Sequence, residues 1–247
     1  MTAVDSQTTD PEARMTLRGH LVELRQRLFK AAVGVFVGCV IAVITLNRVI
    51  DFMVGPYRDA TNDPTRTLKT FGPTEGITIK IKLITYLGLF FASPVWLYQL
   101  WRFIAPALHR KEKRYAIPFV VGSVVLFMFG GFVAVLTMPQ AMKFFEQVNG
   151  SDFESFYSPG NYISLYTLIV LAFGICFEFP VVLVALQLAG AVSSRQLLKG
   201  WRFAIVIVAV IAAVATPSQD PFTLFAMAVP MWLFYFGAIA IGKVLKK

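Results

Sequence analysis

Charged side chains are scarce in this chain. Of its 247 residues, 57% are hydrophobic and only 15% are charged, whereas charged residues make up about 25% of a typical soluble domain. The charges are also segregated, because six stretches contain no Asp, Glu, Lys or Arg: 31–47, 83–101, 115–142, 155–177, 203–219 and 221–242. Since about 20 mainly apolar residues cross the hydrocarbon core of a bilayer, this composition excludes a soluble globular domain and indicates an integral membrane protein.

Cysteine and histidine are nearly absent, with two of each in the chain. Cys39 and Cys176 lie inside apolar stretches, where we expect small buried side chains and neither a disulfide framework nor a metal site. His20 and His109 have no partner motif. The sequence contains no HExxH, no GxSxG and no phosphate-binding glycine loop. We therefore expect no catalytic residue, no metal and no cofactor, and we expect that the chain is not an enzyme.

The apolar stretches predict an all-α membrane protein with a single domain at 16–247, after a disordered polar tail at 1–15. An interfacial helix is expected at 16–28, and six spans at 29–48, 76–104, 115–138, 162–188, 202–216 and 221–242. The fifth and sixth spans form a short hairpin. Prolines at or inside the spans either kink them or are merely tolerated: Pro94, Pro118, Pro180 and Pro230. Kinked helices of this kind are expected to pack as a curved, concave wall.

The distribution of positive charge predicts the orientation, since lysine and arginine favour the cytoplasmic side of short loops. With both termini in the cytoplasm, most of the 23 basic residues lie inside, and the opposite orientation inverts this ratio. The net charge of +9 then follows from topology and contact with anionic lipid head groups, and requires no nucleic acid. The basic residues assigned to the outer side are Arg48, Arg58, Arg66, Lys69, Lys80, Lys82 and Lys143.

The interfacial helix at 16–28 carries a single acid, Glu23. Its leucines recur at helical spacing and form one apolar stripe, while charges occupy the other positions. Glu23 and Arg27 stand four residues apart, so an ordinary surface ion pair is one interpretation, and a binding site is the other. The leucines of the stripe are Leu17, Leu21, Leu24 and Leu28.

The loop after the second span also holds one acid, Glu112, among four basic residues. One interpretation is a solvated loop whose cations fix the topology and in which Glu112 relieves local repulsion; the other is a binding role. Aromatic residues just before the loop fit an interfacial belt or a binding platform: Trp96, Tyr98, Trp101 and Phe103.

Glu178 lies in the middle of the predicted fourth span. A carboxylate at that depth costs roughly 2.5–3.5 kcal/mol on insertion scales and is a candidate for function. It either faces a water-filled cavity or forms hydrogen bonds with a neighbouring helix. At the outer end of the second span, Lys80 and Lys82 are expected to extend toward the membrane interface.

Four segments in order resemble the TatC family of twin-arginine protein translocase subunits. HLVELRQRL at 20–28 resembles the start of the family, and the segment 82–114, which contains LYQLWRFIAPALHRKEKR, resembles its most recognisable stretch. AFGICFEFPV at 172–181 is similar to the fourth span with its buried glutamate. The turn ATPSQDPFTLFAMAVPM at 215–231 is similar to the turn between the fifth and sixth spans.

The resemblance implies a receptor and core scaffold subunit that binds paired-arginine signal peptides at the cytoplasmic face of the bacterial cytoplasmic membrane, for export of folded proteins. The implied partners are single-span subunits of the TatA or TatB type, the signal peptides, membrane lipids and further copies of the chain. By position, the signal-peptide residues are Glu23, Arg25, Phe103, Leu108, Glu112 and Arg114; Glu178 is the intramembrane polar site; Thr216, Asp220 and Thr223 form a partner-contact turn; and Pro56, Lys82, Pro94 and Pro180 are structural.

The residues leave two other functions open. A small secondary transporter would use Glu178 for proton coupling, although such folds usually show inverted repeats and several polar groups at mid-span. A membrane assembly or insertase factor is the second alternative.

Overall fold

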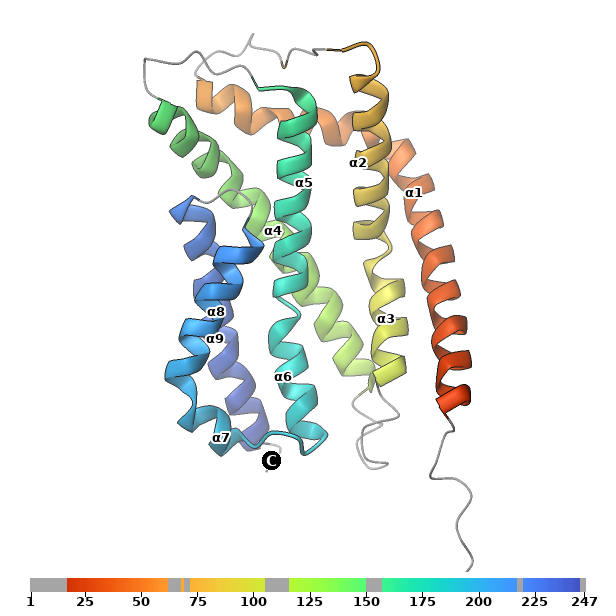
Figure 1. Cartoon of the computed structure of the whole chain (residues 1–247), viewed down its shortest axis with the longest axis vertical. Helices are drawn as coiled ribbons and strands as arrows, with labels where there is room; N and C mark the ends of the chain where they lie inside the picture. Colours follow the sequence, from red (N-terminus) through yellow and green to blue (C-terminus); the bar gives the residue numbers. More distant parts are fainter. Residues whose placement is uncertain are drawn as a thin grey trace, which may run out of the picture.

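The computed structural model describes residues 17–61, 68, 72–104, 116–149, 157–216 and 220–244. Over these ranges the chain is helical and contains no strand (Figure 1). The helices are α1 (Leu17–Thr61), α2 (Glu75–Phe91), α3 (Ser93–Ile104), α4 (Ala116–Asn149), α5 (Pro159–Cys176), α6 (Phe179–Leu188), α7 (Ser194–Lys199), α8 (Trp201–Ala215) and α9 (Pro221–Val244).

Membrane-length apolar helices dominate this architecture. In the part of the chain that is described, four segments are long and apolar enough to cross a membrane: Gly19–Arg58, Ile117–Asn149, Pro159–Leu188 and Pro221–Val244. Helices α2 and α3 meet the same criterion together, although they are bent by 55°. Helix α8 is apolar but has only 15 residues. The prediction of an all-helical membrane protein is therefore confirmed.

Two helices extend well beyond the predicted spans. Helix α1 shows no boundary between the segment 16–28 and the first span, and it continues to Thr61 although the span was predicted to end at residue 48. Helix α4 similarly continues to Asn149 and not only to 138. Charged residues end a hydrophobic stretch but do not end a helix, because most charged side chains are good helix formers. In Figure 1 the last part of α1 turns and crosses the top of the molecule.

The second predicted span is broken at Ala92, between α2 and α3. Pro94 is the second residue of α3, where the missing N–H costs no helical hydrogen bond. The indole Nε1 of Trp96 donates to the backbone oxygen of Leu89, at 3.0 Å. This hydrogen bond satisfies a carbonyl that the break would otherwise leave exposed to an apolar environment.

The fourth predicted span has a milder interruption at Phe177 and Glu178, between α5 and α6. Pro159–Leu188 still forms one membrane-length segment, without the large bend between α2 and α3. Pro180 lies in the first turn of α6, which begins directly after Glu178. Pro118 lies in the first turn of α4, whereas Pro230 lies inside α9. The carboxylate at 178 therefore lies at the junction of two helices, not on a continuous one.

Small residues allow the helices to approach closely. A Cβ added to Gly38 on α1 would overlap the backbone oxygen of Gly88 on α2. A Cβ on Gly130 of α4 would lie 2.6 Å from the backbone oxygen of Phe173 on α5. Helix α4 runs obliquely through the molecule and contacts α1, α3, α5 and α9, so it joins the two ends of the row of helices.

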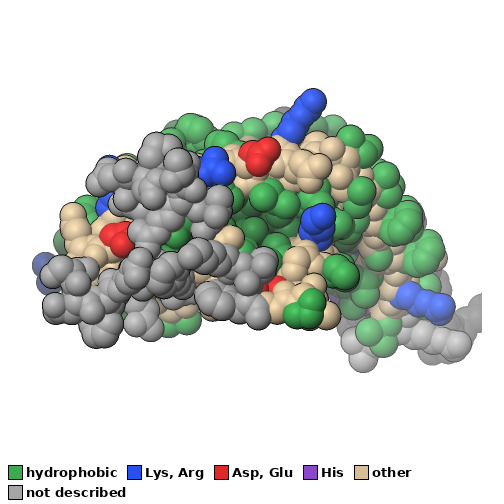
Figure 2. Space-filling view, turned by 90° about the horizontal axis from the view of Figure 1, so that it is seen from above, with side chains coloured by type: hydrophobic (Ala, Val, Ile, Leu, Met, Phe, Trp, Pro, Cys, Tyr) green, Lys and Arg blue, Asp and Glu red, His purple; other side chains and the backbone are tan. Residues whose placement is uncertain are grey.

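The described parts of the segments predicted to face the cytoplasm lie at one end of the molecule, which is the lower end in Figure 1. This end holds the start of α1, the end of α3, helix α7 and the end of α9. Figure 2 views the opposite end, where a few acidic and basic side chains are visible beside apolar ones.

Candidate functional site

The lower part of α1 presents two chemically different faces. Leu21 and Leu28 are 63% and 67% exposed, so this side faces lipid in a membrane. Glu23 and Arg27 are partly buried. Leu21 and Leu28 therefore face outward, whereas Glu23 and Arg27 lie on a half-buried side of the helix.

Glu23 forms the predicted ion pair with Arg27 on the next turn. Arg27 donates from Nε to Glu23 Oε1 at 2.9 Å, and from Nη2 to the same oxygen. The second carboxylate oxygen, Oε2, is buried and accepts no hydrogen bond from the described residues. Glu23 is thus held in place through one oxygen while the other has capacity for a further donor.

Phe103, near the end of α3, contacts α1 through His20. The two rings are stacked with their centroids 4.4 Å apart and their planes 24° from parallel. Helix α3 ends at Ile104, one residue after Phe103, and Arg25 is exposed on α1. Three predicted signal-peptide residues lie outside the described part of the chain: Leu108, Glu112 and Arg114.

Glu178 lies at the centre of a second polar cluster, which joins three separate segments. The indole Nε1 of Trp101 on α3 donates to Ser123 Oγ on α4, and this hydroxyl donates to Glu178 Oε2. Glu178 Oε1 is buried and has no hydrogen-bond partner within the described ranges. The carboxylate can therefore accept one more donor inside the membrane-spanning region.

Two members of this cluster were not assigned to it from the sequence. Trp101 was expected in an interfacial belt, but it is 5% exposed and bonded to Ser123, so for this residue the belt interpretation is wrong. Ser123 is fully buried. A single serine in an apolar stretch is the only sequence signal, and it does not reveal which residue the hydroxyl contacts.

The predicted partner-contact turn is directed inward. Thr216, Asp220 and Thr223 are all buried, with at most 3% exposure. Asp220 accepts from the backbone nitrogen of Thr223 at 2.7 Å and from its hydroxyl at 2.6 Å, and so caps the start of α9. The hydroxyl of Thr216 donates to the oxygen of Ala212, at 2.8 Å. These three side chains stabilise the turn.

The two remaining residues predicted as structural, Pro56 and Lys82, belong to the last part of α1 and the first part of α2, which lie toward the upper end of Figure 1. Pro56 lies inside α1. Nearby, the hydroxyl of Tyr162 on α5 donates to the oxygen of Met53 at 2.5 Å, which fastens this part of α1 to the core. Lys80 and Lys82 are both exposed on the first turns of α2, as expected for side chains that extend toward an interface.

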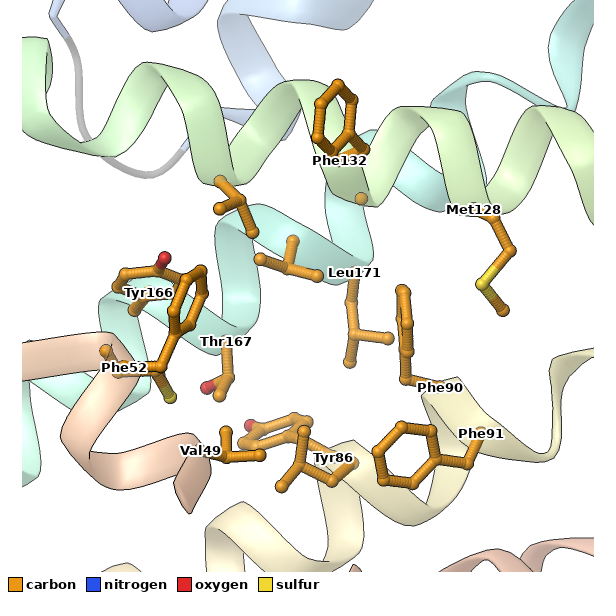
Figure 3. A pocket seen from close by; sticks show the side chains of 15 residues that line it. Val49, Phe52, Tyr86, Phe90, Phe91, Met128, Phe132, Tyr166, Thr167 and Leu171 are labelled. Atoms are coloured by element: carbon orange, nitrogen blue, oxygen red, sulfur yellow. The ribbon is translucent and has the colours of Figure 1, made fainter. Parts of the chain in front are cut away.

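An apolar cavity of about 380 Å³ opens between α1, α2, α4 and α5 (Figure 3). Aromatic and aliphatic side chains line it, among them Phe90, Phe132 and Leu171. Its threonine, Thr167, donates to the oxygen of Ile163 at 2.7 Å. None of the lining residues carries a charge, so the cavity is suited to hydrocarbon and not to a polar solute.

The membrane-length apolar helices define a multi-pass membrane protein. It carries one carboxylate at a helix junction, Glu178, and another near the start of α1, Glu23. The chain belongs to the TatC family, because the model of the Sec-independent protein translocase protein (TatC) matches residues 19–230. It is therefore a subunit of the Sec-independent protein translocase of a bacterial membrane.

Individual relatives agree with this assignment. The TatC protein of Frankia casuarinae is 39% identical over 246 residues, which cover 95% of this chain and 67% of that protein. The TatC protein of Aquifex aeolicus is 39% identical over 236 residues, which cover 93% of this chain and 95% of that protein. A crystal structure described as the twin arginine translocase receptor TatC superposes with a TM-score of 0.74 at 38% identity, covering 92% of this chain and all of that one.

Proposed function

We propose that this chain is the receptor and core scaffold subunit of the twin-arginine translocase, with six spans and both termini in the cytoplasm. Glu23 and Glu112 form one patch on the cytoplasmic face and bind the two adjacent arginines of a signal peptide. The observation that carries the proposal is the buried, unbonded Oε2 of Glu23, one turn from a His20 ring that contacts the end of α3.

The chemistry of arginine explains why paired arginines are required. A guanidinium presents a planar fork of N–H donors that pairs with a carboxylate through two parallel hydrogen bonds, and lysine cannot reproduce this geometry. Arg27 occupies only Oε1 of Glu23. An incoming guanidinium binds at Oε2 and shares or displaces the Arg27 contact, while the second guanidinium binds Glu112.

The test measures binding of a labelled signal peptide, with paired arginines or paired lysines, to the purified full-length chain in lipid nanodiscs. We expect E23Q and E112Q each to weaken binding of the paired-arginine peptide by roughly tenfold to a hundredfold, the value of a charge-assisted hydrogen bond. D51N is the control, since Asp51 is an exposed carboxylate farther along α1. Unchanged binding in the E23Q/E112Q double variant would refute the proposal.

The basic surroundings of both acids predict weak electrostatic steering. Arg25 and Arg27 flank Glu23 in sequence, and Arg110, Lys111 and Lys113 accompany Glu112, so the long-range field repels a dicationic peptide. Recognition must then be short-range. The association rate should rise little as ionic strength falls, and a steep rise would contradict this.

Glu178 is proposed as the intramembrane contact of a single-span partner subunit. Its Oε1 is buried without a partner among the described residues, and an interhelical donor would remove that deficit. Cysteine crosslinking from position 178 tests the contact: a crosslink to the partner helix is expected, and labelling by a water-soluble reagent with no such crosslink would instead indicate a wet cavity.

The alternative of a proton-coupled transporter is not favoured. The apolar cavity between α2 and α5 carries no charged lining residue, whereas a polar substrate requires polar groups at mid-span. Glu178 is bonded to Ser123 on a packed helix junction, and the family is one of protein translocation.

A further inference from the structure

The apolar cavity between α1, α2, α4 and α5 opens on one side to the surroundings of the protein (Figure 3). Phe52 on α1 and Phe132 on α4 belong to its lining and are 59% and 56% exposed. Tyr166 and Leu171 on α5 belong to the same lining and are buried. The cavity therefore has an exposed mouth and a buried wall, and its mouth faces lipid when the protein lies in a membrane.

Water is a poor occupant of this cavity, because a buried water needs about two to four polar partners. The side-chain oxygen atoms of the lining belong to three hydroxyl groups, and Thr167 already donates its own to the backbone oxygen of Ile163. An empty cavity forfeits the dispersion contacts of its lining. Hydrocarbon from the surrounding bilayer removes this loss.

The size of the cavity suits a flexible chain and not a helix. An apolar cavity of about 150 Å³ holds one benzene molecule. In proportion, a volume of about 380 Å³ holds roughly fifteen carbon atoms, which is the length of a phospholipid acyl chain. A helix with its side chains is about 10–12 Å across, so the same volume holds only about one helical turn. The occupant that fits is an acyl chain.

Two cations lie on α2 between the cavity and the upper end of the molecule in Figure 1. Lys80 and Lys82 are both exposed. Lys82 precedes the lining residue Tyr86 by four positions, and Lys80 precedes the lining residue Leu87 by seven, so each lysine shares a helical stripe with a residue of the lining. These separations are about 6 and 10 Å along the helix axis, close to the thickness of about 5–8 Å of each head-group region.

We propose that the cavity binds one acyl chain of an anionic phospholipid, whose head group pairs with Lys80 and Lys82. The lipid belongs to the leaflet around the start of α2, which is the outer leaflet in the proposed topology. The chain itself gives little selectivity, because it leaves one hydrocarbon environment for another. Selectivity comes from the head group, since each lysine near an anionic lipid surface strengthens binding by a factor of roughly five.

Photolabelling in nanodiscs tests this site with the purified full-length chain. The discs consist of phosphatidylcholine with an equal small fraction of either phosphatidylglycerol or phosphatidylcholine that carries a diazirine in its acyl chain. After illumination, mass spectrometry measures labelling of the lining residues Val170 and Leu171 on α5. The reference is labelling of α8, where Val206 and Val210 are exposed.

The wild-type lining should be labelled roughly fivefold to twenty-fivefold more by phosphatidylglycerol than by phosphatidylcholine, whereas α8 should be labelled equally by both. The K80A/K82A variant should lose this preference. K30A is the matched control, because Lys30 is an exposed lysine toward the other end of α1, and it should behave like the wild type.

Two variants that fill the cavity test whether the chain enters it. Val49 on α1 and Val135 on α4 are half-buried lining residues, and V49F and V135F place an aromatic ring in the space from two different helices. Each should lower labelling of Val170 and Leu171 by both lipids and leave labelling of α8 unchanged, which also shows that the variant is folded.

Three results would overturn the proposal. Equal labelling of the wild-type lining by the two lipids would mean that bulk lipid fills the cavity without selection. A preference that persists in K80A/K82A would exclude the lysines as the head-group site. Labelling that is unchanged in both V49F and V135F would place the chain outside the cavity. None of these results depends on paired-arginine binding, which concerns the opposite end of the molecule.

Discussion

The substitution S123A should destabilise the protein through the cluster that joins α3, α4 and the junction of α5 and α6. Ser123 Oγ accepts from the Trp101 indole and donates to Glu178 Oε2. Alanine removes both hydrogen bonds and leaves an indole N–H and a carboxylate oxygen unpaired. Since Glu178 Oε1 already has no partner in the described structure, the carboxylate would then have lost its hydroxyl donor.

The loss of stability expected for S123A follows from two reference values. An unsatisfied buried group costs about 1–3 kcal/mol in soluble proteins, whereas interhelical hydrogen bonds in membranes average about 0.6 kcal/mol with a maximum of about 1.7. The membrane value applies better, because the unfolded state in lipid also finds partners. Two lost bonds therefore predict a loss of about 1–3 kcal/mol in the free energy of unfolding.

Ser93 provides the matched control. It is also fully buried, but its hydroxyl has no hydrogen-bond partner within the described ranges, so S93A should be neutral or slightly stabilising. Denaturant unfolding in mixed micelles, followed by tryptophan fluorescence and circular dichroism, measures both variants. A double-mutant cycle of S123A with W101F should give a coupling of at least about 0.5 kcal/mol. Equal stability losses in S123A and S93A, or additive effects in the cycle, would refute the hydrogen-bond account.

Two further predictions concern stability and are checked by the same unfolding measurement. Y162F should lower the free energy of unfolding by about 1 kcal/mol, because the Tyr162 hydroxyl donates to the backbone oxygen of Met53. Y166F should leave it unchanged or raise it, because the buried Tyr166 hydroxyl has no partner in the described structure. A larger loss in Y166F than in Y162F would contradict these hydrogen-bond assignments. G242A should lower the free energy of unfolding by about 1–3 kcal/mol through overpacking, since the added Cβ would overlap Gln187 Oε1 and lie 2.7 Å from Gln187 Cδ. If G242A unfolds like the wild type, α6 and α9 can move apart without loss of stability.

Much of the fold could be predicted from composition alone. In lipid, backbone N–H and C=O groups must be satisfied within the chain, so a long apolar stretch has to be helical. Prolines at 94 and 180 mark the two junctions because each lies in the first turn of the helix that follows. The extension of α1 to Thr61 could not be read from hydropathy, since a helix can leave the bilayer without ending.

The candidate site was predicted only in part. Glu23 and Phe103 were named from the resemblance, and the structure adds that His20 joins their two helices. Asp220 was also named, as part of a partner-contact turn, and the structure adds that its buried carboxylate caps the start of α9. The polar side chains of Glu23 and Asp220 indicated candidate functional positions, but residue type does not indicate whether a side chain points into the protein or away from it.

The sequence by itself determined the class of protein, the approximate positions of the membrane helices, the charge asymmetry between the two sides and the family. The tertiary structure decided which faces of those helices meet, and so which distant polar groups pair: His20 with Phe103, and Ser123 with Trp101 and Glu178. The reason is that lipid is as apolar as a protein core. The hydrophobic pattern of a membrane helix therefore does not distinguish its lipid-facing side from its packed side. The way the helices cross in the tertiary structure determines which side faces lipid.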